Sequence, residues 1–73
     1  MDGAHPEPDF TVTDHGTVRT ITAVSEAAQE HYRDHIAPEL EGWQTVGTNA
    51  FHTDWRAAEH MQWRLEDEGW VFG

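Results

Sequence analysis

Two histidines that lie four residues apart, His31 and His35, are the residues whose type and spacing most directly suggest chemistry. On a helix this spacing lets both rings reach one metal ion. The sequence lacks the glutamate that a zinc hydrolase helix carries directly after its first histidine, and a third ligand would have to come from elsewhere in the chain. We therefore interpret His31 and His35 as histidines that border the core, with metal binding as the alternative.

Nucleophilic catalysis has little support in the sequence. The chain contains no cysteine and no lysine, and its single serine, Ser25, lies where a helix N-cap is expected. No glycine-rich phosphate loop is present. The neighbours Glu30 and His31, or Glu59 and His60, have the types needed for acid–base chemistry, but adjacent helix positions point in different directions. We expect no enzymatic activity and no cofactor.

Acidic residues dominate the charge of the chain, with 14 Asp and Glu against four Arg and a formal net charge of −10. A phosphate backbone or an anionic membrane would be repelled, so we expect neither as a direct partner. Glu26, Glu30 and Asp34 would form a row at i, i+4 spacing on one helix, and a basic partner would relieve the repulsion within that row. Solubility through like-charge repulsion is the simpler interpretation of the acidity. The functional interpretation is a surface that meets a basic, nucleic-acid-binding protein.

The segment 54–69 is predicted to be a helix with one side chain out of place. Asp54 is a good N-cap type, and Gly69 is the preferred residue just past a helix end. Trp63 falls on the polar side of this helix, whose charged members are Arg56, Glu59, His60, Arg64, Glu66 and Asp67. Because tryptophan is enriched among residues that dominate binding energy, we predict that Trp63 anchors a partner-binding surface. To that surface we also assign Arg56, Glu59, Glu66, Asp67, Glu26, Glu30 and Asp34.

The 73 residues are expected to form one domain, which a chain this short builds with a small core. Residues 1–9 combine proline, glycine and acidic residues, and we expect them to be mobile, with the domain occupying 10–73. The chain has no apolar run of about 20 residues, as a membrane span needs, and its N-terminus does not resemble a signal peptide. We therefore expect a cytoplasmic protein, in the host cytoplasm if it is encoded by a phage.

The periodicities predict an α+β fold of order ββαβαβ, a two-layer sandwich with two helices on one face of a mixed four-stranded sheet. The expected strands are 10–13, 17–23, 43–52 and 70–72, and the expected helices are the segment from Ser25 to Pro38 and the segment 54–69. Gly47 predicts a bulge in the third strand, unless the Gly-Thr-Asn stretch divides it into two shorter pieces.

The face of the sheet away from the helices is expected to carry many of the threonines. These are at positions 11, 13, 17, 20, 22, 45 and 48. If that face also presented Phe10, Trp43 or Phe51, it would be a natural dimer surface, because large exposed apolar patches mark interfaces.

A family resemblance is carried by residues 10–36, FTVTDHGTVRTITAVSEAAQEHYRDHI, and by the later DEGWVF. These segments resemble short uncharacterised proteins of bacteria and their phages, which have an aromatic-led strand, a His-Gly-Ser/Thr hairpin, a capped helix and a closing Asp-Gly or Glu-Gly before a final strand. The matching residues are Phe10, His15, Gly16, Thr17, Ser25, Ala27, Ala28, Glu68 and Gly69. The resemblance covers most of the chain after residue 9 and implies no activity. The tryptophans at 55, 63 and 70 are outside the shared pattern.

The sequence thus predicts a non-enzymatic acidic module that binds a basic surface of a partner protein. By extension, it could be a phage- or mobile-element-type inhibitor that imitates nucleic acid in front of a nucleic-acid-binding protein. One alternative is a self-associating structural or accessory protein, in which Trp63 and the open sheet face form a homodimer. A second alternative is a histidine-based metal or pH-responsive module.

Overall fold

The computed structural model describes residues 7–73 as an α+β fold, which confirms the predicted class. The strands are β1 (Phe10–Asp14), β2 (Val18–Ala23), β3 (Thr45–Val46) and β4 (Ala50–Asp54), and the helices are α1 (Glu26–His31) and α2 (Trp55–Asp67). Between α1 and β3 the chain forms a π-helical turn (Tyr32–Ile36) and two 3₁₀ turns (Ala37–Glu39 and Gly42–Gln44). In this part of the chain, no helix combines the length and apolarity that crossing a membrane requires.

The four strands pair in the order β1-β2-β4-β3, and every neighbouring pair is antiparallel. The predicted element order ββαβαβ is therefore wrong, and so is the predicted mixed sheet, because a mixed sheet would pair some neighbouring strands in parallel. Gly47, at φ +66°, lies in a turn that divides the predicted strand 43–52 into the β3–β4 hairpin. The expected final strand 70–72 contributes one parallel bridge, between Phe10 and Phe72. The alternative that the Gly-Thr-Asn stretch splits the third strand is therefore the one that the structure adopts.

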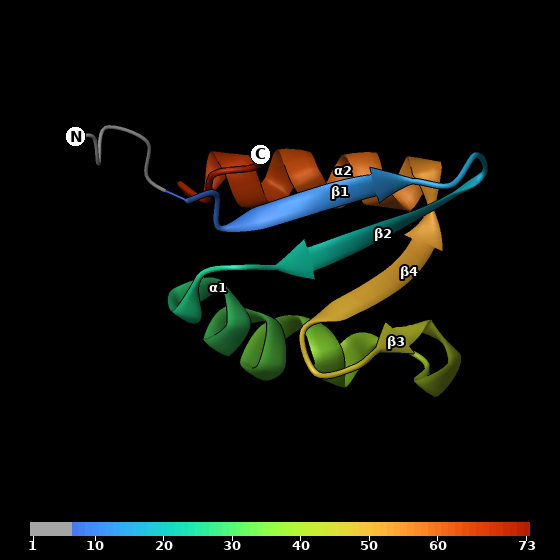
Figure 1. Ribbon diagram of the computed structural model, residues 1–73, viewed down its shortest axis with the longest axis horizontal. Helices are drawn as coiled ribbons and strands as arrows, with labels where there is room; N and C mark the ends of the chain where they lie inside the picture. The colour runs from blue at the N-terminus through green and yellow to red at the C-terminus, as the bar shows by residue number, and fades with distance from the viewer. Residues whose placement is uncertain (1–6) are drawn as a thin grey trace.

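Both helices cover the same face of the sheet, as predicted, and the core lies between them and the strands (Figure 1). Phe10, Ile21 and Phe51 point into this layer and are at most 1% exposed. From α1 and α2, Ala28 and Leu65 complete the same cluster. Of the three aromatic residues that could have made the opposite face a dimer surface, Phe10 and Phe51 are therefore buried on the helix side, and Trp43 is 74% exposed.

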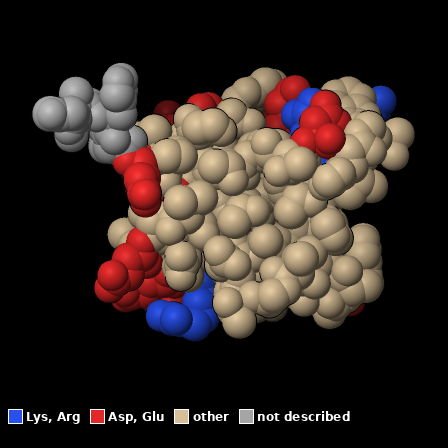
Figure 2. All heavy atoms as spheres, in the orientation of Figure 1, with Lys and Arg blue, Asp and Glu red and all other residues tan. Residues whose placement is uncertain are grey.

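The opposite side of the sheet, here called the open face, carries threonines in the alternate positions of the strands. The antiparallel register places Thr11, Thr13, Thr20 and Thr22 there, and the Thr20 hydroxyl lies 2.8 Å from Nδ1 of His52. Thr17 and Thr48 lie in turns, and Thr45 pairs with Phe51 on the helix side. Figure 2 views the molecule from the strand side and shows charged side chains around the margin of this face, with uncharged residues across its centre.

The predicted helix starts and stop are confirmed by their hydrogen bonds and dihedral angles. The Ser25 hydroxyl accepts from the Ala28 amide at 3.1 Å, and the Asp54 carboxylate accepts from the Ala57 amide at 2.9 Å. Gly69 follows α2 with φ +104°, a conformation in which glycine carries no steric cost. Each helix therefore begins at a side-chain cap, as predicted.

Asp9 connects three separate parts of the chain. Its carboxylate accepts from the Ser25 hydroxyl at 2.8 Å and from the Val71 amide at 3.0 Å, and its carbonyl accepts from the Val24 amide at 2.7 Å. The expectation that residues 1–9 are mobile is thus wrong for Asp9, while residues 1–6 lie outside the described residues. The start of β1, the cap of α1 and the C-terminal segment are held together at this one side chain.

We predict that Asp9→Asn lowers the free energy of unfolding by about 1–2 kcal/mol, because an amide offers one oxygen where the carboxylate offers two acceptors. For a domain of this size the melting temperature should fall by roughly 4–8 °C for each kcal/mol. Thermal unfolding followed by circular dichroism measures the shift. Asp67→Asn, an exposed change of the same chemistry on α2, should stay within about 0.5 kcal/mol of the unsubstituted chain. Equal melting temperatures for the two variants would show that Asp9 does not hold these segments together.

Candidate functional site

The π-helical turn at Tyr32–Ile36 shapes the surface between the two helices. Pro38 has no amide hydrogen, so the α-helical bond from position 38 to the Asp34 carbonyl cannot form. The Ala37 amide instead donates to the Tyr32 carbonyl, five residues back. Tyr32 anchors the turn, since its hydroxyl donates to the Ala50 carbonyl at 3.1 Å and its ring stacks on Phe51 at 5.7 Å. π-helical turns of this kind are rare and often occur at functional sites.

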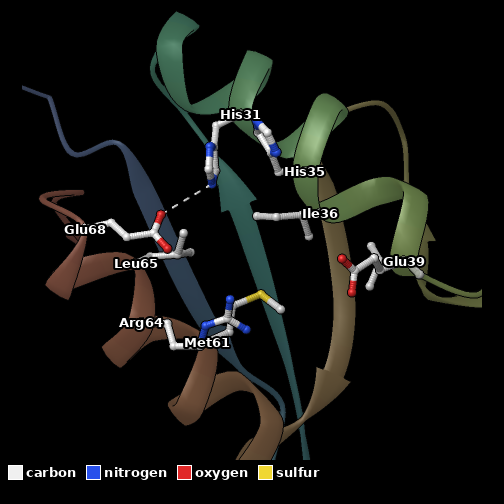
Figure 3. Close-up of a pocket in the computed structure, with 9 residues that line it drawn as sticks. His31, His35, Ile36, Glu39, Met61, Arg64, Leu65 and Glu68 are labelled. Atoms are coloured by element: carbon white, nitrogen blue, oxygen red, sulfur yellow. Dashed lines mark ion pairs between the residues drawn. The ribbon is translucent and has the colours of Figure 1, made fainter.

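Between this turn and α2 lies a cavity of about 510 Å³, here called the inter-helix groove (Figure 3). It is lined by His31, His35, Ile36, Glu39, Leu40, Met61, Arg64, Leu65 and Glu68. Figure 3 shows the apolar side chains of Ile36, Leu65 and Met61 between Glu68 on one side and Glu39 on the other. The groove therefore has an apolar floor and carboxylates at both ends.

The two predicted histidines lie together at one end of the inter-helix groove. Their ring centroids are 4.9 Å apart, and the His31 ring also lies 4.9 Å from that of Trp70. Nε2 of His31 is 3.8 Å from a carboxylate oxygen of Glu68. Among residues 7–73, no three His, Asp or Glu side chains come together as a set that could hold a metal ion. His31 is half-buried against Trp70, so the ring serves as a wall of the groove.

The predicted acidic row lies on the outer side of α1 and continues into the π-helical turn. Glu26, Glu30 and Asp34 are all exposed. Glu30 and Asp34 line, with Ala27, His31, His35 and Trp70, a shallow depression of about 290 Å³. Because the two histidines belong to both hollows, this depression adjoins the inter-helix groove. The structure thus brings two members of the row beside the groove, whereas Glu26 lies outside it.

Trp63 lies on the outer side of α2 and is 56% exposed. It precedes the buried Leu65 by two positions, which at about 100° per residue turns it away from the core. Its ring contacts that of His60 at 5.6 Å in an edge-to-face arrangement. Glu30 likewise lies two positions from a buried residue, Ala28 of α1, and is turned away from the core for the same reason. The tryptophan and the acidic row are therefore exposed on different helices, each turned away from the buried residues of its own helix.

The other predicted contact residues of α2 have different surroundings. The guanidinium of Arg56 lies 5.2 Å from the ring centroid of Trp55, so Arg56 packs on that tryptophan and not on Trp63. Glu66 and Asp67 are exposed, and Glu59 is half-buried. Trp55 itself, the first residue of α2, is 40% exposed.

The inter-helix groove was not predicted from the sequence. Its residues come from separate elements, Met61 and Leu65 from α2, and Glu39 and Leu40 from the segment after the π-helical turn. The one local signal is Leu40, an isolated apolar residue in the acidic connector EPELEG. Its position opposite α2 depends on the π-helical turn, and neither composition nor spacing specifies that turn.

Comparisons of the chain with protein-family models, with curated proteins and with solved structures return no match. The resemblance to short bacterial and phage proteins therefore stays a prediction.

The π-helical turn can be tested through Tyr32, because burial raises the pKa of its hydroxyl above the ordinary value of about 10. We predict that Tyr32→Phe costs about 1 kcal/mol of unfolding free energy near neutral pH, through loss of the bond to Ala50. Above about pH 10 the unfolded tyrosine ionises while the folded one stays protonated, so the stability of the unsubstituted chain falls and the gap narrows. Urea unfolding at several alkaline pH values measures this.

The chain is well suited to this experiment, since it has one tyrosine, no lysine and no cysteine to titrate in the same range. Tyr32→Phe is itself the control, because its stability should be flat through the interval in which the unsubstituted chain weakens. Two parallel curves would contradict a buried, hydrogen-bonded hydroxyl at this turn.

Proposed function

We propose that this protein is a non-enzymatic acidic module that binds a basic surface of a partner protein through its two helices. The observation that carries the proposal is that Trp63 and the acidic row are both exposed on the two helical segments, which cover the same face of the sheet (Figure 1). A tryptophan 56% exposed on a helix offers an amphipathic side chain that a partner can bury. Carboxylates on the same side attract basic groups and repel acidic ones.

The charge distribution supports the helix side as the contact surface. The acidic row, Glu26, Glu30 and Asp34, lies along α1 and the π-helical turn, and the groove is bordered by Glu39 and Glu68. The open face, in contrast, has an uncharged centre (Figure 2). A basic partner is therefore steered toward the helices. Nucleic-acid-binding proteins carry surfaces of the required sign, so an inhibitor that occupies such a surface from a cytoplasmic location is the specific form that we propose.

The open face supports a second candidate function, self-association. Val18 and Val46 are 40% and 39% exposed beside its threonines, and two copies of a chain of net charge −10 repel each other least through an uncharged face. The sequence-based alternative placed both Trp63 and the open face in the homodimer, but Trp63 lies on α2, which covers the other face of the sheet, so a homodimer through the open face alone would leave it in water. Sedimentation at several protein concentrations distinguishes a dimer from a monomer that awaits a partner.

We predict that the immobilised full-length chain captures from its native host a basic protein that dissociates as salt rises. Trp63→Ala should weaken the purified complex by at least about tenfold, because truncating an interface anchor removes its buried contacts. Isothermal titration calorimetry of the two purified proteins measures the change.

The matched control is Trp43→Ala, which truncates a tryptophan that is 74% exposed and lies in the 3₁₀ turn Gly42–Gln44, on neither α1 nor α2. Its affinity should stay within about twofold of the unsubstituted chain, as expected for a residue outside the interface. An equal loss for the two variants would contradict the assigned surface. A concentration-dependent dimer with no captured partner would replace the proposal by self-association.

A further inference from the structure

The inter-helix groove exposes apolar surface at the centre of the proposed contact side. Leu40 and Met61 are only half-buried, and they pack on the core residues Ile36 and Leu65 beneath them. The volume of about 510 Å³ lies within the range of pockets that enclose small ligands, and it has room for one or two large apolar side chains. Methionine adapts its shape to different partners, which suits a binding surface.

The charges around the groove define the kind of occupant that fits. Among the described residues that line the groove and its adjoining depression, four carboxylates face one arginine. They are Glu30, Asp34, Glu39 and Glu68, with Arg64. In Figure 3, Glu39 and Glu68 lie on opposite sides of the apolar floor. A partner segment with an apolar side chain on the floor could thus place basic side chains on both sides of it, one near Glu39 and one near Glu68.

We infer that the inter-helix groove binds a basic amphipathic segment of the partner, a site that rests on the protein-binding function proposed above. An apolar side chain of that segment contacts Leu40, Met61 and Leu65, and lysine or arginine residues on either side of it pair with Glu39 and Glu68. This is the arrangement in which an amphipathic helix binds a groove by its apolar face. Arg64 restricts the sequence of that segment further, because its positive charge disfavours a lysine or arginine of the partner directly above the apolar floor.

The wall of the groove is formed before any partner binds. His31 is held between Trp70, at 4.9 Å, and Glu68, at 3.8 Å from its Nε2. Trp70 is in turn fixed by its edge-to-face contact with Phe10 at 5.6 Å, and Tyr32, the residue after His31, ties the same wall to β4. A preformed wall reduces the ordering that binding requires, which favours affinity for a short segment.

The probe is a synthetic peptide of leucine and lysine, with leucine at positions i, i+3, i+4 and i+7 of a helix. We expect the full-length chain to bind it at least about tenfold more tightly than a serine and lysine peptide of equal charge, because only the first covers the floor. Fluorescence anisotropy of labelled peptides measures both affinities. A leucine and glutamate peptide of the same pattern should not bind, since its charges match those of the rim.

Two sets of variants locate the peptide. Leu40→Ser should weaken the leucine and lysine peptide about fivefold, and Glu39→Gln with Glu68→Gln should do the same without touching the floor. The matched control, Glu7→Gln with Asp14→Asn, makes the same change of net charge at two exposed carboxylates that do not line the groove. It should change affinity less than about twofold. Melting curves of all variants identify any loss that comes from unfolding.

The outcomes separate the groove from the broader function. If the serine and lysine peptide bound as tightly as the leucine and lysine peptide, or if the two double variants weakened binding equally, the groove would not be the site, while an acidic contact surface would stand. If neither lysine peptide bound, basic chains would not be attracted to the helices at all. The groove and the proposed function would then both be overturned.

Discussion

The complete burial of Phe10 is the constraint on which the rest of this small domain depends. With no disulfide available, the start of β1 and the C-terminal segment pack together at this ring, which is 0% exposed. Phe72 stacks on it at 5.3 Å and Trp70 meets it edge to face at 5.6 Å. The Phe10 amide donates to Val71 at 3.0 Å, and Asp9 binds the same C-terminal segment. A short C-terminal segment thereby completes the core at the edge of the sheet.

This closure also positions the candidate site. Trp70 lies between Phe10 and His31, so the residue that packs against the core is the residue that supports one wall of the inter-helix groove. On the same side of the groove, Tyr32 joins the π-helical turn to β4. The groove is thus a consequence of how two separate segments, one C-terminal and one in the middle of the chain, attach to the same sheet.

The parts of the fold that the sequence predicted are those governed by local interactions. Ser25 and Asp54 cap their helices through bonds that span three residues, and Gly69 ends α2 through its own conformation. The polar surroundings of Trp63 follow from the helical period alone, so its exposure could be predicted.

The parts that the sequence did not predict depend on contacts between distant segments. The residues around Gly47 fit a bulge as well as a turn, and the pairing of Val46 with Ala50 decides between them. Trp70-Val71-Phe72 has the composition of a strand but makes a single bridge, because Asp9 and Phe10 fix it at the sheet edge. The groove depends on Leu40 and Met61, from two separate elements, lining the same cavity. The periodicity within either element does not show this.

The central claim is that the helix side is the contact surface, and amide chemical-shift mapping with the captured partner tests it most directly. The account predicts that the largest changes fall on Leu40, Met61, Trp63 and Glu68, with little change along the open face. Largest changes at Thr11, Thr20 and Thr22, with Trp63 unaffected, would contradict it.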